Sequence, residues 1–163
     1  MDIKTAFDGQ TLTSDWGLSG GLLASDNGLK TAIVLSLFTD RRAEAGDALP
    51  DGTADRRGWW GDVAPPANAP SDMVWLSGSR LWLLAREKQT AETAKRARDY
   101  CQEALAWLER MGVVAGIDVE TSWQAMGVLG ITITVTKANA VSERFAWAWT
   151  AANNLATVWK DEA

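Results

Sequence analysis

Arginines and tryptophans lie together between glycines in one short block of this sequence. The block, DRRGWWGD at residues 55–62, places Arg56 and Arg57 close to Trp59 and Trp60. A guanidinium group can stack on an indole ring for about 0.5–2 kcal/mol while its fork pairs with a carboxylate. The block can therefore lock its own loop, or it can anchor the loop on a neighbouring protein. The residues by themselves leave both interpretations open.

A second basic block, LFTDRRA, follows the end of a predicted helix. Arg41 and Arg42 can bind the carbonyl groups that are exposed there, because the helix dipole favours cations at a carboxy-terminal end. This reading makes them helix-capping surface charges. The same residues can also join the first block in binding a partner protein.

No group of residues in the chain predicts catalysis. The sequence has no histidine, which excludes Ser-His-Asp and Cys-His triads and HExxH zinc sites. Its one cysteine, Cys101, lies among alanine and leucine in a helical pattern, as is typical of a small buried residue. Acidic residues near the basic blocks, such as Asp40 and Asp62, lie among arginines, which lower a carboxyl pKa and oppose the protonated acid that a glycosidase needs. We therefore expect no catalytic residue, no cofactor and no metal.

The charge and the apolar pattern restrict the partners. A formal net charge of −5 disfavours a general nucleic-acid-binding surface. The amino-terminal residues MDIKTAFDG do not resemble a signal peptide, and no run reaches the roughly 18 apolar residues of a membrane span. We expect a protein that is made in the host cytoplasm, does not insert into membranes, and binds other proteins.

Tryptophan is unusually frequent, with ten residues against one tyrosine. A core of this size does not easily enclose ten indoles, and tryptophan is enriched at interface hot spots. We therefore expect several of them at interfaces, including Trp82, Trp147 and Trp149.

The elements that position these residues follow from periodicity. Apolar spacing predicts a helix from a cap at Ser25 or Asp26 through LKTAIVLSLF, a short helix over residues 79–86, and a long helix from a Thr90 cap to about Arg110. Alternation of period two then predicts three antiparallel strands around residues 117–123, 131–136 and 145–149. A small hairpin is expected over residues 16–23.

The order of helices followed by strands indicates an α+β fold, with two to three helices packed on a C-terminal three-stranded sheet. Between the first two helices the chain lacks periodicity, and the proline-rich residues 63–78 are typical of a flexible connector. One domain is expected to span residues 1–163.

The blocks LFTDRRA, LPDG, DRRGWWGD and SRLWLLAREKQT together resemble the baseplate protein family of Mu-like phages, which is distantly similar to the sheath-initiating wedge proteins of contractile tails. The resemblance runs from about residue 15 to about residue 149. It implies a non-enzymatic wedge subunit of the virion, present in several copies around the tail axis. The implied partners are other wedge proteins, the hub and spike, and the tail sheath protein.

Two other classes of function stay open: a tail-associated cell-wall hydrolase, and an assembly chaperone that is absent from finished particles. On the baseplate interpretation, the residues expected to contact partner proteins are Arg41, Arg42, Arg56, Arg57, Trp59, Trp60, Asp62, Arg80, Trp82, Trp147 and Trp149.

Overall fold

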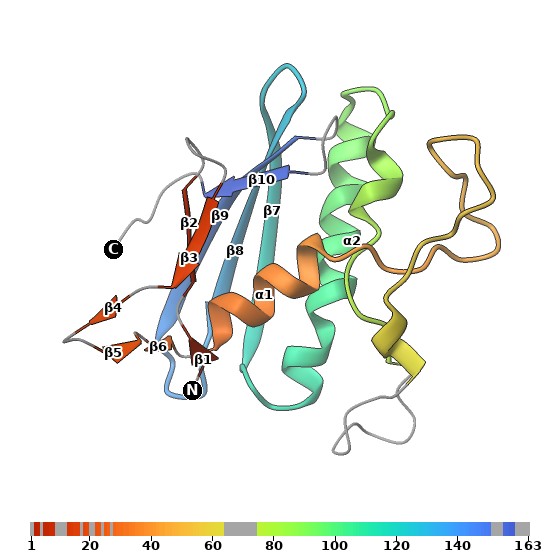
Figure 1. Cartoon of the computed structure of the whole chain (residues 1–163). Coiled ribbons are helices and arrows are strands. Elements are labelled where there is room, and N and C mark those ends of the chain that lie inside the picture. Colours follow the sequence, from red (N-terminus) through yellow and green to blue (C-terminus); the bar gives the residue numbers. More distant parts are fainter. Residues whose placement is uncertain are drawn as a thin grey trace. The chain divides into compact units, whose positions relative to one another are not determined.

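The chain divides into two compact units, Met1–Val34 and Leu35–Ala163. The structure, a computed structural model, describes residues 28–63 and 75–150 in full (Figure 1). Within residues 2–26 and 155–158 it describes only the backbone of the strands. Most of the predicted connector at residues 63–78 lies outside the described residues, and a single domain over residues 1–163 stays a prediction.

The first unit contains short antiparallel strand pairs. The pair β4 and β5 confirms the predicted hairpin, because Leu18 pairs with Leu23 and Ser19 with Leu22. The pairs are β1 (Asp2–Ile3) with β6 (Ser25–Asp26), β2 (Thr5–Asp8) with β3 (Thr13–Trp16), and β4 (Leu18–Ser19) with β5 (Leu22–Leu23).

The first helix starts later than predicted. Ser25 and Asp26 form strand β6 and therefore do not cap it, and helix α1 spans Leu29–Phe38. Gly28 precedes the helix with a φ of +71°, a left-handed conformation that glycine adopts at little cost. The predicted cap was wrong because a side chain that can cap a helix can equally be part of a strand, and strand pairing decides between the two.

Helix α2, Ala91–Arg110, agrees with the prediction at both ends. The Thr90 hydroxyl accepts a hydrogen bond from the Thr93 amide at 3.1 Å, and Gly112 follows the helix with a φ of +68°. Its buried stripe includes Ala94, Ala97, Cys101, Ala104, Leu105 and Leu108, which follow the apolar spacing that predicted the helix.

The second unit contains an antiparallel sheet of order β10-β9-β8-β7. The α+β class and the three predicted strands are confirmed, and the short fourth strand β10 was not predicted. In Figure 1 helix α2 lies next to β7, at one edge of the sheet. The strands are β7 (Gly116–Ala125), β8 (Val128–Thr136), β9 (Ser142–Thr150) and β10 (Leu155–Val158).

Alternate residues of the sheet form the core. Ile131 lies opposite Trp147 and Leu129 opposite Trp149, and all four side chains are buried. Trp147 also packs against Phe38, with ring centroids 6.1 Å apart. Both tryptophans were predicted at an interface, whereas here their side chains are buried in the core.

The predicted helix over residues 79–86 is shorter than expected. Only Leu81–Leu84 form a helical turn, η2, of the 3-10 type, and all four side chains are buried. Ser79 is held instead by its hydroxyl, which donates to the Leu37 carbonyl at 2.5 Å, and by a bridge to Asp40. These contacts fix the preceding backbone outside the helix.

Candidate functional site

The loop that follows α1 is joined to the segment before η2 by two backbone hydrogen bonds. The Arg41 amide donates to the Ser79 carbonyl at 3.0 Å, and the Ser79 amide donates to the Thr39 carbonyl at 2.9 Å. Gly78 makes this approach possible, because a Cβ at that position would lie 2.2 Å from the Thr39 carbonyl oxygen. The loop therefore starts from a fixed point.

Gly78→Ala is expected to lower the free energy of unfolding by about 3 kcal/mol, because it adds a steric overlap to a left-handed backbone with φ of +88°. Gly112→Ala is the matched control: its φ is +68°, but nothing lies within 4 Å of the added Cβ. It should cost only about 1–2 kcal/mol. Urea unfolding of both variants measures the difference, and equal losses would show that the bridge tolerates the methyl group.

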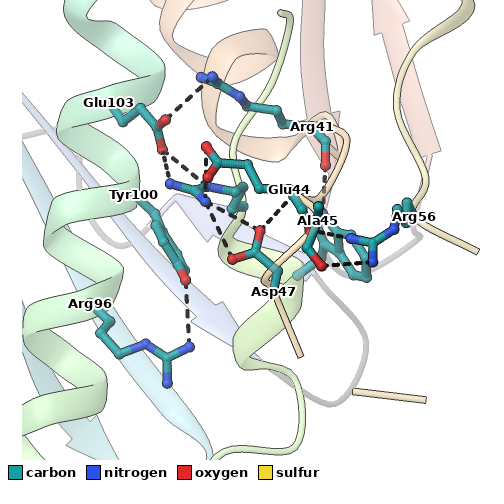
Figure 2. Close-up of polar contacts among 10 residues, drawn as sticks. Arg41, Glu44, Ala45, Asp47, Arg56, Arg96, Tyr100 and Glu103 are labelled. Carbon is teal, nitrogen blue, oxygen red and sulfur yellow. Dashed lines mark hydrogen bonds and ion pairs between the residues drawn. The ribbon is translucent and has the colours of Figure 1, made fainter. Parts of the chain in front are cut away.

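Arg80 is the shared ion-pair partner of three carboxylates. Figure 2 shows these carboxylates, Glu44, Asp47 and Glu103, pointing toward one another. Its Nη2 is 2.9 Å from Glu103 Oε2, and its Nη1 is 3.2 Å from Asp47 Oδ2 and 3.3 Å from Glu44 Oε1. The guanidinium also lies over the ring of Tyr100, 4.9 Å from the centroid. Burial by itself would lower the pKa of Arg80, but the bonds to Glu103 and Asp47 outweigh it and raise the pKa. The cation is thus permanent and ties the loop to α2.

Arg41 extends the same cluster. Its Nη2 lies 3.3 Å from Glu103 Oε1, so that one carboxylate of α2 holds two arginines. The Arg41 carbonyl accepts a hydrogen bond from Trp82 Nε1 at 2.9 Å. Arg41 Nε is buried and has no hydrogen-bond partner in the part of the chain that the structure describes.

The arginines of DRRGWWGD bond within the loop. Arg57 Nη1 lies 2.6 Å from Asp40 Oδ2, and its guanidinium lies 4.3 Å from the ring centroid of Trp82. Arg56 donates to the carbonyl groups of Glu44 and Ala45. Both residues therefore fit the interpretation of a block that locks its own loop.

Arg42 is exposed and has a weaker contact, since its Nη1 lies 3.4 Å from the Arg57 carbonyl oxygen. A Cβ on Gly58 would lie 2.9 Å from Arg42 Cβ, so the Arg42 side chain runs directly beside the turn that leads to Trp59. This arginine keeps most of its hydrogen-bonding capacity for other groups.

The tryptophans of the block point outward. Trp59, Trp60 and Val63 are 44%, 82% and 88% exposed, and we call these three residues the tryptophan patch. The two rings lie 5.3 Å apart at an angle of 45°. A Cβ on Gly61 would approach the Trp59 ring to 2.1 Å, so this glycine allows the ring to fold over the backbone.

The C-terminal end of the patch, at Trp60–Val63, is also held in place. Residues Trp60–Val63 form a short 3-10 turn, η1, in which Asp62 Oδ1 accepts a hydrogen bond from the Ser77 amide at 2.9 Å. Asp62, predicted as an interaction residue, thus fixes the turn on which two of the exposed side chains lie.

The structure separates the predicted site residues into three groups. Trp82, Trp147 and Trp149 are buried, so their rings stabilise the core and are not available as exposed anchors. The arginines other than Arg42 hold the loop together with Asp62, whereas Arg42, Trp59 and Trp60 are exposed. For these residues a contact with a partner stays a prediction.

The sequence did not indicate Glu103 and Tyr100, which complete the cluster from α2. They lie three residues apart, on one face of the helix and outside its buried stripe. A search for acidic and aromatic residues at that spacing could have found them, although not their arginine partners.

Known proteins match the part of the chain that contains both helices and the loop between them. Residues 29–142 match the family model described as phage protein GP46. The chain belongs to the GP46 family of phage proteins. It is 47% identical over 114 residues to baseplate protein gp46 of Escherichia phage Mu, covering 70% of this chain and 73% of that protein. It is 35% identical over 122 residues to Mu-like prophage FluMu protein gp46 of Haemophilus influenzae, covering 75% and 78%. The resemblance to the Mu-like family is confirmed.

The GP46 match contains α1, both arginine blocks, α2 and the first two strands of the sheet. Among the described residues of this GP46 protein, no three His, Cys, Asp or Glu side chains are grouped as a metal site would require. None of the helices in that same part is long and apolar enough to cross a membrane. Cys101 is fully buried, and burial raises the pKa of its thiol.

Proposed function

We propose that this protein is a structural component of a phage tail baseplate, and that it acts there as a wedge subunit around the central hub that supports initiation of the contractile sheath. The main support is the 47% identity to a protein that is named a baseplate protein of phage Mu. The identity extends over 70% of this chain. The partners we propose are neighbouring wedge proteins, the hub and spike, and the sheath protein.

The tryptophan patch fits a docking role on physical grounds. Interface hot spots are enriched in tryptophan, and truncating one typically costs about 2 kcal/mol or more of binding free energy. The arginine cluster and the Asp62 contact hold the loop before binding, which reduces the conformational entropy that binding would otherwise cost. A fixed loop with two exposed indoles is therefore suited to assembly.

We further propose that the protein performs no chemistry and that it remains in the finished virion. Quantitative mass spectrometry of purified particles tests this, and stoichiometric presence is expected. Absence from particles would favour the assembly chaperone. Release of peptidoglycan fragments by the purified protein would favour the cell-wall hydrolase.

Trp60→Ala is expected to prevent assembly without loss of folding. The test uses a host that carries the phage genome with this gene deleted, and the variant is supplied in trans. We expect at least tenfold fewer tailed particles than with the wild type. A tenfold loss corresponds to about 1.4 kcal/mol of binding free energy. Negative-stain microscopy counts the particles, and immunoblots measure the soluble subunit.

Met126→Ala is the control for this experiment. Met126 is 93% exposed in the turn between β7 and β8 and is as apolar as the patch, but it lies outside it. This variant should assemble normally. If both variants assemble normally, or if particle loss simply follows loss of soluble protein, the docking role of the patch is wrong.

A further inference from the structure

A groove runs between the first half of α2 and the middle of β7. Its volume is about 580 Å³, within the roughly 300–1,000 Å³ that is common for binding pockets. Strand β7 is the edge of the sheet on this side. The groove is lined by Ala91, Ala94, Lys95 and Arg98 from α2 and by Asp118, Val119, Glu120, Thr121, Ser122 and Trp123 from β7.

The helix wall of the groove is basic. Lys95 and Arg98 lie on the helix wall, and neither has an ion-pair partner among the residues that the structure describes. Asp118 and Glu120 also border the groove, but they alternate along β7 with Val119 and Thr121, which face α2, and their side chains are exposed on the other face of the strand. Between the walls, Trp123 is fixed by a hydrogen bond from its Nε1 to the Thr90 carbonyl at 3.0 Å. An occupant with aromatic rings and a carboxylate on one side would match the helix wall, because cations attract both groups.

The tryptophan patch has this chemistry. Its two exposed indoles lie between Asp55 and Asp62 in the sequence, and Arg42 lies on the other side of the turn. An indole placed over Arg98 would gain a cation–π contact, and the two acidic residues would face the basic helix wall.

We propose that the tryptophan patch of one copy of this protein binds the α2–β7 groove of a second copy. Turn η1 lies apart from the first half of α2 and the middle of β7 (Figure 1), so the patch meets the groove of another molecule. Such a contact joins two different surfaces and is heterologous; its repetition closes a ring or continues as a filament. The place of this contact in a baseplate rests on the proposed function, whereas its chemistry does not.

Two variants, each of which removes one half of the contact, test the inference on the purified full chain. Trp60→Ala truncates the more exposed of the two rings of the patch and keeps the groove. Lys95→Glu combined with Arg98→Glu removes the basic wall and keeps the patch; both side chains are exposed, so circular dichroism should show unchanged helix content. Sedimentation equilibrium from micromolar to millimolar concentration gives the mass of each sample and of an equimolar mixture.

The wild type should increase in mass with concentration, and each variant alone should remain a monomer. The mixture should form a species of twice the monomer mass that does not grow further, because each pair of variants retains one intact patch and one intact groove. A monomeric wild type, variants that associate as the wild type does, or a mixture that stays monomeric would each overturn the inference. None of these results would alter the mass spectrometry of particles, so the baseplate role is tested separately.

Discussion

Arg80→Met is expected to lower the free energy of unfolding by about 3 kcal/mol. The Arg80 side chain is only 14% exposed, and it is the shared partner of Glu103, Asp47 and Glu44. Methionine keeps much of the volume of the side chain but removes the charge. The three carboxylates are then left close together with less compensation, and breaking a buried ion pair on one side is far more costly than replacing both partners. Urea unfolding followed by far-ultraviolet circular dichroism measures the loss.

Arg96→Met is the matched control. Arg96 also lies beside Tyr100, with its guanidinium 5.9 Å from the ring centroid, and it pairs with Glu87 at 2.9 Å. The side chains of this pair are 38% and 41% exposed, and solvent-exposed ion pairs contribute about 0.2–1 kcal/mol. A loss for Arg80→Met as small as that for Arg96→Met would contradict the view that Arg80 ties the loop to α2.

The elements with a strong local pattern could be predicted from the sequence. The buried stripe of α2 repeats every three or four residues, its Thr90 cap is local, and the branched residues of β8 alternate without interruption. In each case one face of the element is buried, so the spacing of apolar residues in the sequence indicates the type of element. Helix α1 could be located for the same reason, although its first residue could not.

The contacts of the loop could not be predicted, because they join residues far apart in the chain. Arg80 meets Glu103 and Asp47, and Arg57 meets Trp82, through the path of a backbone that has no periodicity. The sequence indicated that arginine can contact indole and carboxylate, but it did not indicate that the indole beside Arg57 is that of Trp82. Arg57 stacks on a distant tryptophan, which leaves the adjacent Trp59 and Trp60 exposed.

The composition of the chain does not show which tryptophans are buried and which are exposed. Trp147 and Trp149 occupy alternate positions of β9 that face the core, while Trp60 lies on a one-turn helix whose residues are not buried. A count of ten indoles indicates that some must be exposed, but only the position of each one relative to a sheet or helix decides which.

Trp82→Ala and Trp60→Ala make the same chemical change with opposite expected results. Trp82 is 1% exposed, packs with Ala43 and Leu83, donates its Nε1 hydrogen to the Arg41 carbonyl, and supports the Arg57 guanidinium. Truncation leaves a cavity and an unpaired carbonyl, and we expect a loss of about 3–5 kcal/mol in the free energy of unfolding. Trp60→Ala should change it by about 0.5 kcal/mol or less, as is usual for exposed positions.

Trp82→Phe separates packing from hydrogen bonding at this position. The phenyl ring keeps much of the packing and the stacking surface for Arg57, but it cannot donate to the Arg41 carbonyl, so a loss of about 1–3 kcal/mol is expected. The order of stability should therefore be Trp60→Ala, then Trp82→Phe, then Trp82→Ala. If Trp60→Ala proves as unstable as Trp82→Ala, then the exposed ring stabilises the fold, and its effect on particle formation would be a folding defect and not a lost contact.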